Sequence, residues 1–159
     1  MTKPSKNGFE NLRPAVFFNS LFIRGMEPDE IASLTSDIRI VPDPKKKKDL
    51  IEEPDYELQI LSQPQGQVAH THRVIHISRI DLEPFQQDIY DADGNVVTQA
   101  VYSNYQKYGD ISFPSKIVIT RPLDQYSLTV TITKLALNQP MDNDQFDMKI
   151  PDNVPIQHL

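Results

Sequence analysis

The sequence contains no cysteine and no tryptophan, and it has only five glycines among 159 residues. The lack of cysteine excludes disulfides, cysteine-ligated zinc and thiol catalysis. No apolar run approaches the ~20 residues that a membrane-spanning helix needs. The first eight residues are polar and no apolar segment follows them, so the sequence gives no sign of a secretion signal. Taken alone, that pattern predicts a cytosolic protein, provided that Met1 is the true start.

Positive charge is also scarce, with 16 basic residues against 22 acidic ones and a net charge of −6. A nucleic-acid partner would need a basic face, so this balance argues against one. The one basic run, Lys45–Lys48, lies between Asp43 and Glu52 in a proline-flanked stretch. We interpret it as a solvated hairpin tip rather than a site for phosphate or lipid head groups.

The clearest period in the chain lies between residues 113 and 137. From Tyr126 to Thr133 apolar and hydroxyl side chains alternate, as expected for a strand with one buried face and one solvent-exposed face. Pro122 indicates a turn over residues 121–125, so this stretch predicts two paired strands.

Two short helices are expected near the start of the chain. Pro14 suits the first turn of a helix running to Arg24, and Gly25 would end it. This helix is apolar around most of its circumference and therefore needs cover. A second helix is predicted at Pro28–Leu34, because acidic residues occupy its first turn.

The rest of the sequence reads as strands joined by hairpin-length links, which favours an antiparallel sheet over βαβ units. We predict a mainly β fold with short helices (α+β): a curved antiparallel meander, forming an unclosed half-barrel under an N-terminal helical lid. Residues 1–159 would form one domain, with a flexible arm (1–11), a helical lid segment (12–35) and the sheet (36–156). The predicted strands are Ser36–Val41, Tyr56–Leu61, His72–Ile80, Phe85–Tyr90, Val96–Tyr105, the pair within 113–137, and Phe146–Ile150.

Patterns that could support catalysis or metal binding are weak. His70, His72 and His76 share strand parity, but no carboxylate nearby completes a zinc site, so a metal-dependent hydrolase is the least favoured function. Asp91–Asn95 resembles the start of a calcium loop but reads better as a turn. We expect no metal, no cofactor and no catalytic residues.

The candidate binding residues are apolar. The first helix can meet the inner face of the strand pair, which allows either an ordinary filled core or a cavity beneath a lid. Most apolar stripes are core, so periodicity favours the filled core modestly. The residues expected to line the cavity, should it exist, are Phe17, Phe18, Leu21, Phe22, Ile117, Ile119, Tyr126, Leu128, Val130 and Ile132.

A set of short motifs, in order and at consistent spacing, resembles the C-terminal portion of LolA/LolB-like outer-membrane lipoprotein-sorting proteins. Upstream, Asn11–Pro14 and Pro28–Ile31 resemble the preceding segment in related envelope lipoproteins, and the likeness spans most of residues 11–156. The motifs are Asp91–Thr98, Tyr102–Tyr105, Gly109–Ile117, Leu137–Met141, Phe146 and Ile150–Pro151.

The resemblance implies a non-catalytic carrier whose half-barrel holds the acyl chains of lipoproteins or another lipid, in the periplasm or anchored to the outer membrane. On this resemblance, the apolar residues expected to line the cavity would bind the lipid. Family members begin with a secretion signal and further strands that this sequence does not contain. We therefore expect a fragment of a longer product, or a sheet with one edge that must pair with something. The alternative function is a structural envelope domain with a filled core, which meets an envelope protein partner through its surface or sheet edge.

Overall fold

The structure is a computed structural model that describes residues 14–43, 45–66 and 68–136. The predicted arm (1–11) and the predicted strand Phe146–Ile150 lie outside this range. The described elements are α1 (Pro14–Leu21), β1 (Glu30–Pro42), β2 (Leu50–Ser62), β3 (His70–Ser78), β4 (Pro84–Tyr90), β5 (Val96–Tyr108), β6 (Ile111–Arg121) and β7 (Tyr126–Thr131).

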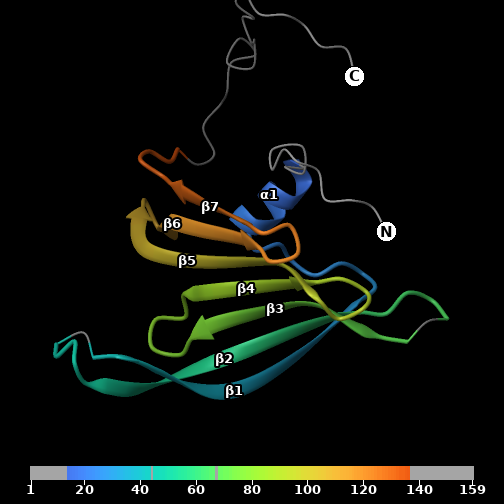
Figure 1. Ribbon diagram of the computed structural model, residues 1–159, viewed down its shortest axis with the longest axis horizontal. Helices are drawn as coiled ribbons and strands as arrows, with labels where there is room; N and C mark the ends of the chain where they lie inside the picture. The colour runs from blue at the N-terminus through green and yellow to red at the C-terminus, as the bar shows by residue number, and fades with distance from the viewer. Residues whose placement is uncertain (1–13, 44, 67, 137–159) are drawn as a thin grey trace, which may run out of the picture.

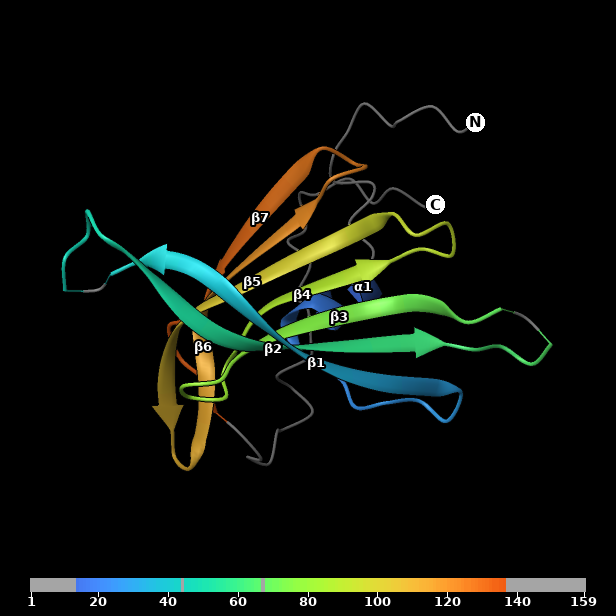
Figure 2. The ribbon, with the colours of Figure 1, turned by 90° about the horizontal axis from the view of Figure 1, so that it is seen from below.

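The seven described strands form one antiparallel sheet in chain order, from β1 at one border to β7 at the other (Figure 1). No pairing joins β7 to β1 within the described residues, so the sheet is open there. The predicted mainly β, antiparallel and unclosed meander is confirmed. Figure 2 shows that the β1–β2 hairpin extends beyond its neighbours, because β3 pairs with β2 only from Asp55 onward.

The predicted second helix at Pro28–Leu34 is wrong. Only a turn forms there, and β1 begins at Glu30, so the lid segment (12–35) and the sheet boundary at residue 36 are also wrong. The Glu30 carboxylate does accept a hydrogen bond from the Glu27 amide (2.8 Å), as it would at a helix start. Pairing with β2 along all of β1 overrides this local preference.

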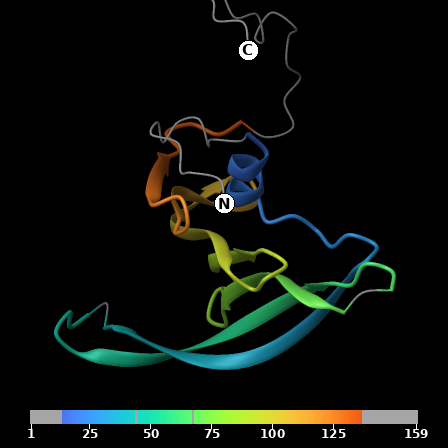
Figure 3. The ribbon, with the colours of Figure 1, turned by 45° about the vertical axis from the view of Figure 1, so that its right-hand side comes forward.

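Helix α1 is also shorter than predicted and ends at Leu21 rather than Arg24. It lies against one face of the sheet beside β5 and β6 (Figure 3). Its side chains Phe17 and Leu21 pack there on a buried cluster formed by Ala100, Tyr102, Ile117 and Ile119. This cluster lies on β5 and β6, and further buried apolar residues lie on β2 (Ile60) and β3 (Val74 and Ile75).

Two of the predicted turns are confirmed. The chain turns after Pro122, and the Arg121 guanidinium contacts the Asp124 carboxylate at 2.7 Å. At the β4–β5 hairpin, Asp91 accepts hydrogen bonds from the backbone amides of Asp93 (3.1 Å) and Asn95 (2.8 Å). The Asp91 carboxylate thus stabilises a turn, as the interpretation against a calcium loop expected.

Candidate functional site

An apolar pocket of about 220 Å³, partly open to solvent, lies where the end of α1 meets β5 and β6. Its walls are mainly aromatic, aliphatic and proline side chains. Phe22 lies 5.9 Å from Phe113, measured between ring centroids, and is itself 48% exposed. The lining residues are Leu21, Phe22, Ile23, Pro84, Tyr102, Tyr105, Ser112, Phe113 and Pro114.

Two of the predicted lipid-binding residues, Leu21 and Phe22, line this pocket. Ile117 and Ile119 are buried core residues, and Phe17 packs against them. Phe18 is 57% exposed. The first helix and the strand pair thus meet as predicted, largely through filled core.

The predicted inner face of β7 follows the expected alternation. Leu128 stands opposite Ile119, and Val130 stands opposite Ile117, so the apolar side chains of both strands share one face. Val130 and Ile132 pack against the core, and Tyr126 and Leu128 are half-buried. This face extends the core toward the border of the sheet.

None of the strand residues that line the pocket was among the predicted site residues. Asn104 has a positive φ of 55°, which twists β5 so that both Tyr102 and Tyr105 join the core beside α1. The Tyr102 hydroxyl is buried, and burial raises the pKa of this phenol. The signal available in the sequence was the pair of tyrosines three residues apart, followed by Phe113-Pro114.

Polar side chains from two neighbouring strands, β4 and β5, hold the end of α1. The last carbonyls of a helix have no partner within it. Here Tyr102 Oη donates to the Ser20 carbonyl (2.8 Å), and Gln87 Nε2 donates to the Asn19 carbonyl (3.0 Å). These bonds fix the C-terminal end of α1 to the sheet.

The chain just after α1 is fixed in the same way by Arg73. Its guanidinium donates to the carbonyls of Arg24 (2.8 Å) and Gly25 (2.7 Å), and to the Glu30 carboxylate (3.1 Å). Burial alone would raise the pKa of Glu30. The hydrogen bonds from the Glu27 amide and His72, with the charge of Arg73, outweigh burial and lower it.

A second hollow, of about 270 Å³, adjoins the apolar pocket and shares Pro84, Tyr102 and Tyr105 with it. Its other walls are mixed, with charged and polar side chains beside Ile80 and Phe85. Arg39 pairs with Glu53 at 2.7 Å and stacks over the Phe85 ring at 3.7 Å, while Asp81 and Glu83 add carboxylates. The two hollows together offer an apolar end and a charged end.

The three histidines do not converge. The sheet register shifts beside His72, which contacts Glu30 at 2.7 Å, whereas His76 contacts Asp88 at 3.4 Å. Among the described residues, no group of three histidine or acidic side chains is placed to hold a metal ion. Nor is any helix in this part of the chain long and apolar enough to cross a membrane.

The fold and pocket define an open antiparallel sheet protein with a small apolar site at the end of its one described helix. Residues 43–150 match the model of a protein family described as "-like: Uncharacterized protein". The match covers more than half of the chain, and the chain belongs to this family. No curated protein matches the sequence.

Two solved structures are similar at low identity. A LolA superfamily protein from Nitrosomonas europaea is 14% identical with a TM-score of 0.47, over 69% of this chain and 47% of the other. An outer membrane lipoprotein-sorting protein domain from Vibrio parahaemolyticus is 13% identical with a TM-score of 0.47, over 72% of this chain and 46% of the other. The chain spans just under half the length of each.

Proposed function

We propose that the protein is a non-catalytic lipid- or lipoprotein-binding module of the bacterial cell envelope, located in the periplasm or at the outer membrane. It would hold an acyl chain in the pocket between α1 and strands β5–β6. The observation that carries the proposal is the pocket itself, whose walls are mainly apolar and whose rim exposes Phe22. The ordered motifs that resemble lipoprotein-sorting proteins support the same function.

The size of the pocket limits what it can hold. At about 220 Å³ it is smaller than the ~300–1,000 Å³ of sites for drug-sized ligands, so it would take only a segment of one acyl chain. Each buried methylene contributes about 0.8 kcal/mol, so even a short segment would bind measurably. The adjoining charged hollow would face the polar end of the same molecule.

In this proposal α1 acts as the lid. The hydrogen bonds from Tyr102, Gln87 and Arg73 hold its C-terminal end and the chain that follows. Lifting that end would break these hydrogen bonds, which is costly. The helix would therefore open at its N-terminal end, with Phe17 leaving the core to admit a longer chain, while Leu21, beside the held carbonyls, stays in place.

Uptake of a fluorescent fatty acid by delipidated protein tests the function. Phe22→Asp puts a charge at the rim and should weaken binding at least about tenfold, since an unpaired charge resists burial. Phe18→Asp is the matched control, because Phe18 is similarly exposed and does not line the pocket. No saturable uptake by the unmodified protein, or equal effects of the two variants, would contradict the proposal.

A second candidate is a structural envelope domain that acts through its sheet edge. The observation that favours it is β1, a 13-residue border strand that, within the described part of the chain, pairs with β2 alone. Under this candidate the pocket beside α1 would have no ligand, and Phe22→Asp would change only stability.

A further inference from the structure

Strand β1 has backbone groups that point away from the sheet. In an antiparallel pair, alternate residues direct their N–H and C=O groups toward the partner strand, and the remaining residues direct theirs outward. Ile38 stands opposite Pro54, which has no N–H, and the Ile38 amide donates instead to the carboxylate of Asp37 (2.8 Å). Ile38 therefore directs its backbone groups away from β2, and so do the other even-numbered residues of β1.

The same even-numbered positions carry exposed apolar side chains on one face of the sheet. Leu34, Ile38 and Ile40 are 58%, 61% and 67% exposed. Natural sheets usually blunt such an edge with lysine, proline or a bulge, because a long apolar edge pairs with other strands. No lysine lies within β1, its register with β2 is unbroken, and its proline is its last residue, Pro42.

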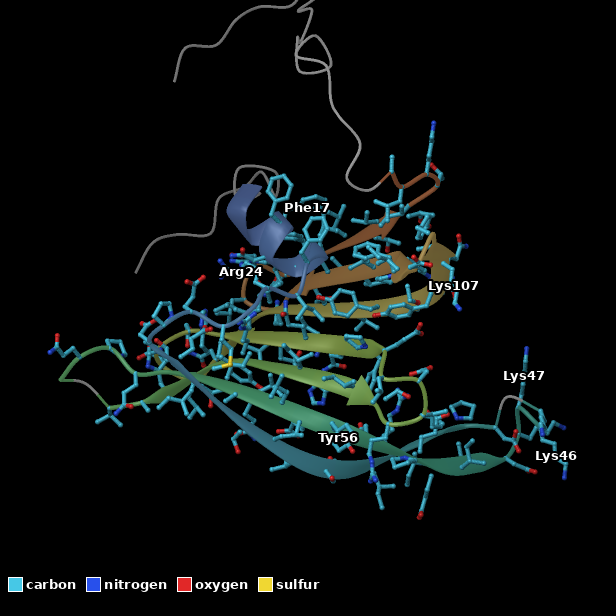
Figure 4. The ribbon with its side chains drawn as sticks, turned by 180° about the vertical axis from the view of Figure 1, so that it is seen from behind. Phe17, Arg24, Lys46, Lys47, Tyr56 and Lys107 are labelled. Carbon is cyan, nitrogen blue, oxygen red and sulfur yellow. The ribbon has the colours of Figure 1, made fainter. Side chains whose placement is uncertain are left out.

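Charges of opposite sign lie at the two ends of β1. The hairpin tip carries Lys45–Lys48, and Figure 4 shows Lys46 and Lys47 projecting at that end of the molecule. The turn that leads into the other end carries the exposed residues Glu27 and Asp29. A strand related to β1 by a two-fold axis runs antiparallel to it, so each basic tip would lie near the acidic turn of the other copy.

We propose that β1 pairs with β1 of a second copy of this chain, with Ile38 at the two-fold axis. In this register Ser36 stands opposite Ile40 of the second copy, and Leu34 opposite its Pro42. Asp37 of each copy stands opposite Arg39 of the other copy. Pairing would supply a carbonyl partner for the Ile38 amide and release the Asp37 carboxylate toward Arg39 of the second copy, whose guanidinium also pairs with Glu53 of its own chain. Opposite charges at directly facing positions stabilise a strand pair.

This inference concerns the second candidate function and is independent of acyl-chain binding. The apolar pocket is lined by α1, the residues just after it and strands β4–β6, and Arg39 of β1 lines the adjoining hollow but not this pocket. Failure of dimerisation would therefore leave the lipid-binding proposal intact, and failure of lipid uptake would leave the dimer intact.

Sedimentation equilibrium of the full chain tests the assembly. The unmodified protein should show a reversible monomer–dimer equilibrium that weakens with salt. Ile38→Lys places two like charges together at the axis and should weaken the dimer at least tenfold. Leu123→Lys, at an exposed site in the β6–β7 turn, should leave it unchanged. A monomer at every concentration, or equal effects of both substitutions, would overturn the proposal.

The absence of cysteine allows a direct test of the register. Ile38→Cys places two thiols across the axis, within the 4.4–6.8 Å Cα separation that disulfides span, so mild oxidation should give a covalent dimer. Ser36→Cys should cross-link far less. Cross-linking through Ser36→Cys rather than Ile38→Cys would overturn the proposed register, and cross-linking through neither would overturn the strand pairing. Unchanged circular dichroism confirms that each variant folds.

Discussion

The hydroxyl of Tyr102 on β5 donates a buried hydrogen bond of 2.8 Å to the carbonyl of Ser20 in the last turn of α1, across 82 residues of sequence. This bond joins the helix to the central part of the core. It also places the aromatic ring of Tyr102 in the wall of the apolar pocket. One side chain thus fixes the position of α1 and shapes the candidate site.

Tyr102→Phe should lower the free energy of unfolding by about 1–2 kcal/mol, since it keeps the ring and leaves a buried carbonyl without this partner. Urea denaturation followed by circular dichroism measures the change. Tyr108→Phe is the control, because the Tyr108 hydroxyl makes only an exposed 3.4 Å contact with Gln106. Equal effects of the two substitutions would show that the Tyr102–Ser20 bond does not anchor the helix.

Ile117→Ala should be the more severe change, with a loss of about 2–5 kcal/mol, because it opens a cavity in the core. Ile117 is 0% exposed and lies in the cluster against which α1 packs. Ile111→Ala on the same strand should have an effect within about 0.5 kcal/mol, as is usual at an exposed site. A mild effect at Ile117 would mean that the β5–β6 cluster is not the centre of the core.

Gly94→Ala tests the hairpin between β4 and β5. Gly94 has a φ of 82°, a conformation that a side chain disfavours, so the substitution should cost about 1 kcal/mol or more. Gly25→Ala is the matched control, since an added Cβ meets nothing within 4 Å at either glycine and Gly25 has no positive φ. Thermal melting of the two variants distinguishes backbone strain from a general effect of removing glycine.

Stability should also depend on pH through the pair formed by His76 and Asp88. The hydrogen bond to Asp88 raises the pKa of His76 above its ordinary 6.5, despite burial. Burial alone would raise the pKa of Asp88. Hydrogen bonds from His76, Gln99 and Gln86 outweigh it and lower this pKa below the ordinary 3.8. Both side chains are therefore charged between pH 3.8 and pH 6.5.

The signs of the two shifts define the window of highest stability. A raised histidine pKa contributes stability that is complete below pH 6.5 and is lost as the pH rises through the folded-state value. A lowered carboxyl pKa contributes stability above pH 3.8 that is lost as the pH falls through the folded-state value. Glu30 adds to the loss in acid. The melting temperature should therefore be highest between about pH 4 and 6.5.

His76→Asn tests the alkaline side of this profile. The fall in melting temperature between pH 6 and pH 8.5 should become smaller, because the titrating partner of Asp88 is gone. His70→Asn, at the other end of β3, should leave that fall unchanged. A profile that is insensitive to His76→Asn would show that this pair does not contribute to stability.

Local pattern predicted the sheet well and the lid segment poorly. The alternation from Tyr126 onward placed Leu128 and Val130 on the face that they occupy, because a strand with one buried face must alternate. Pro28–Leu34 has the acidic start of a helix, and the Glu27–Glu30 contact does form. The strand pairing that overrides it comes from β2, between 24 residues away (Leu34 with Leu58) and 32 residues away (Glu30 with Ser62), and a local pattern does not contain that information.

The candidate site was predictable only in part, for a related reason. Leu21 and Phe22 were identified from the apolar character of their helix. The wall formed by Tyr102, Tyr105 and Phe113 depends on the twist of β5 at Asn104. No pattern in the sequence indicates the positive φ of 55° at this residue. Arg73 and Gln87 lie in strands and were not expected to hold a helix, because their partners are backbone carbonyls.

The most direct test of the central claim uses the absence of tryptophan. Phe22→Trp places a single fluorophore at the rim of the pocket, and Leu123→Trp places one in the remote β6–β7 turn. A fatty acid brominated on its acyl chain quenches indole fluorescence only at close range. Acyl-chain binding beside α1 should give saturable quenching of the Phe22→Trp protein and none of the Leu123→Trp protein. Equal quenching of both, or of neither, would contradict acyl-chain binding beside α1.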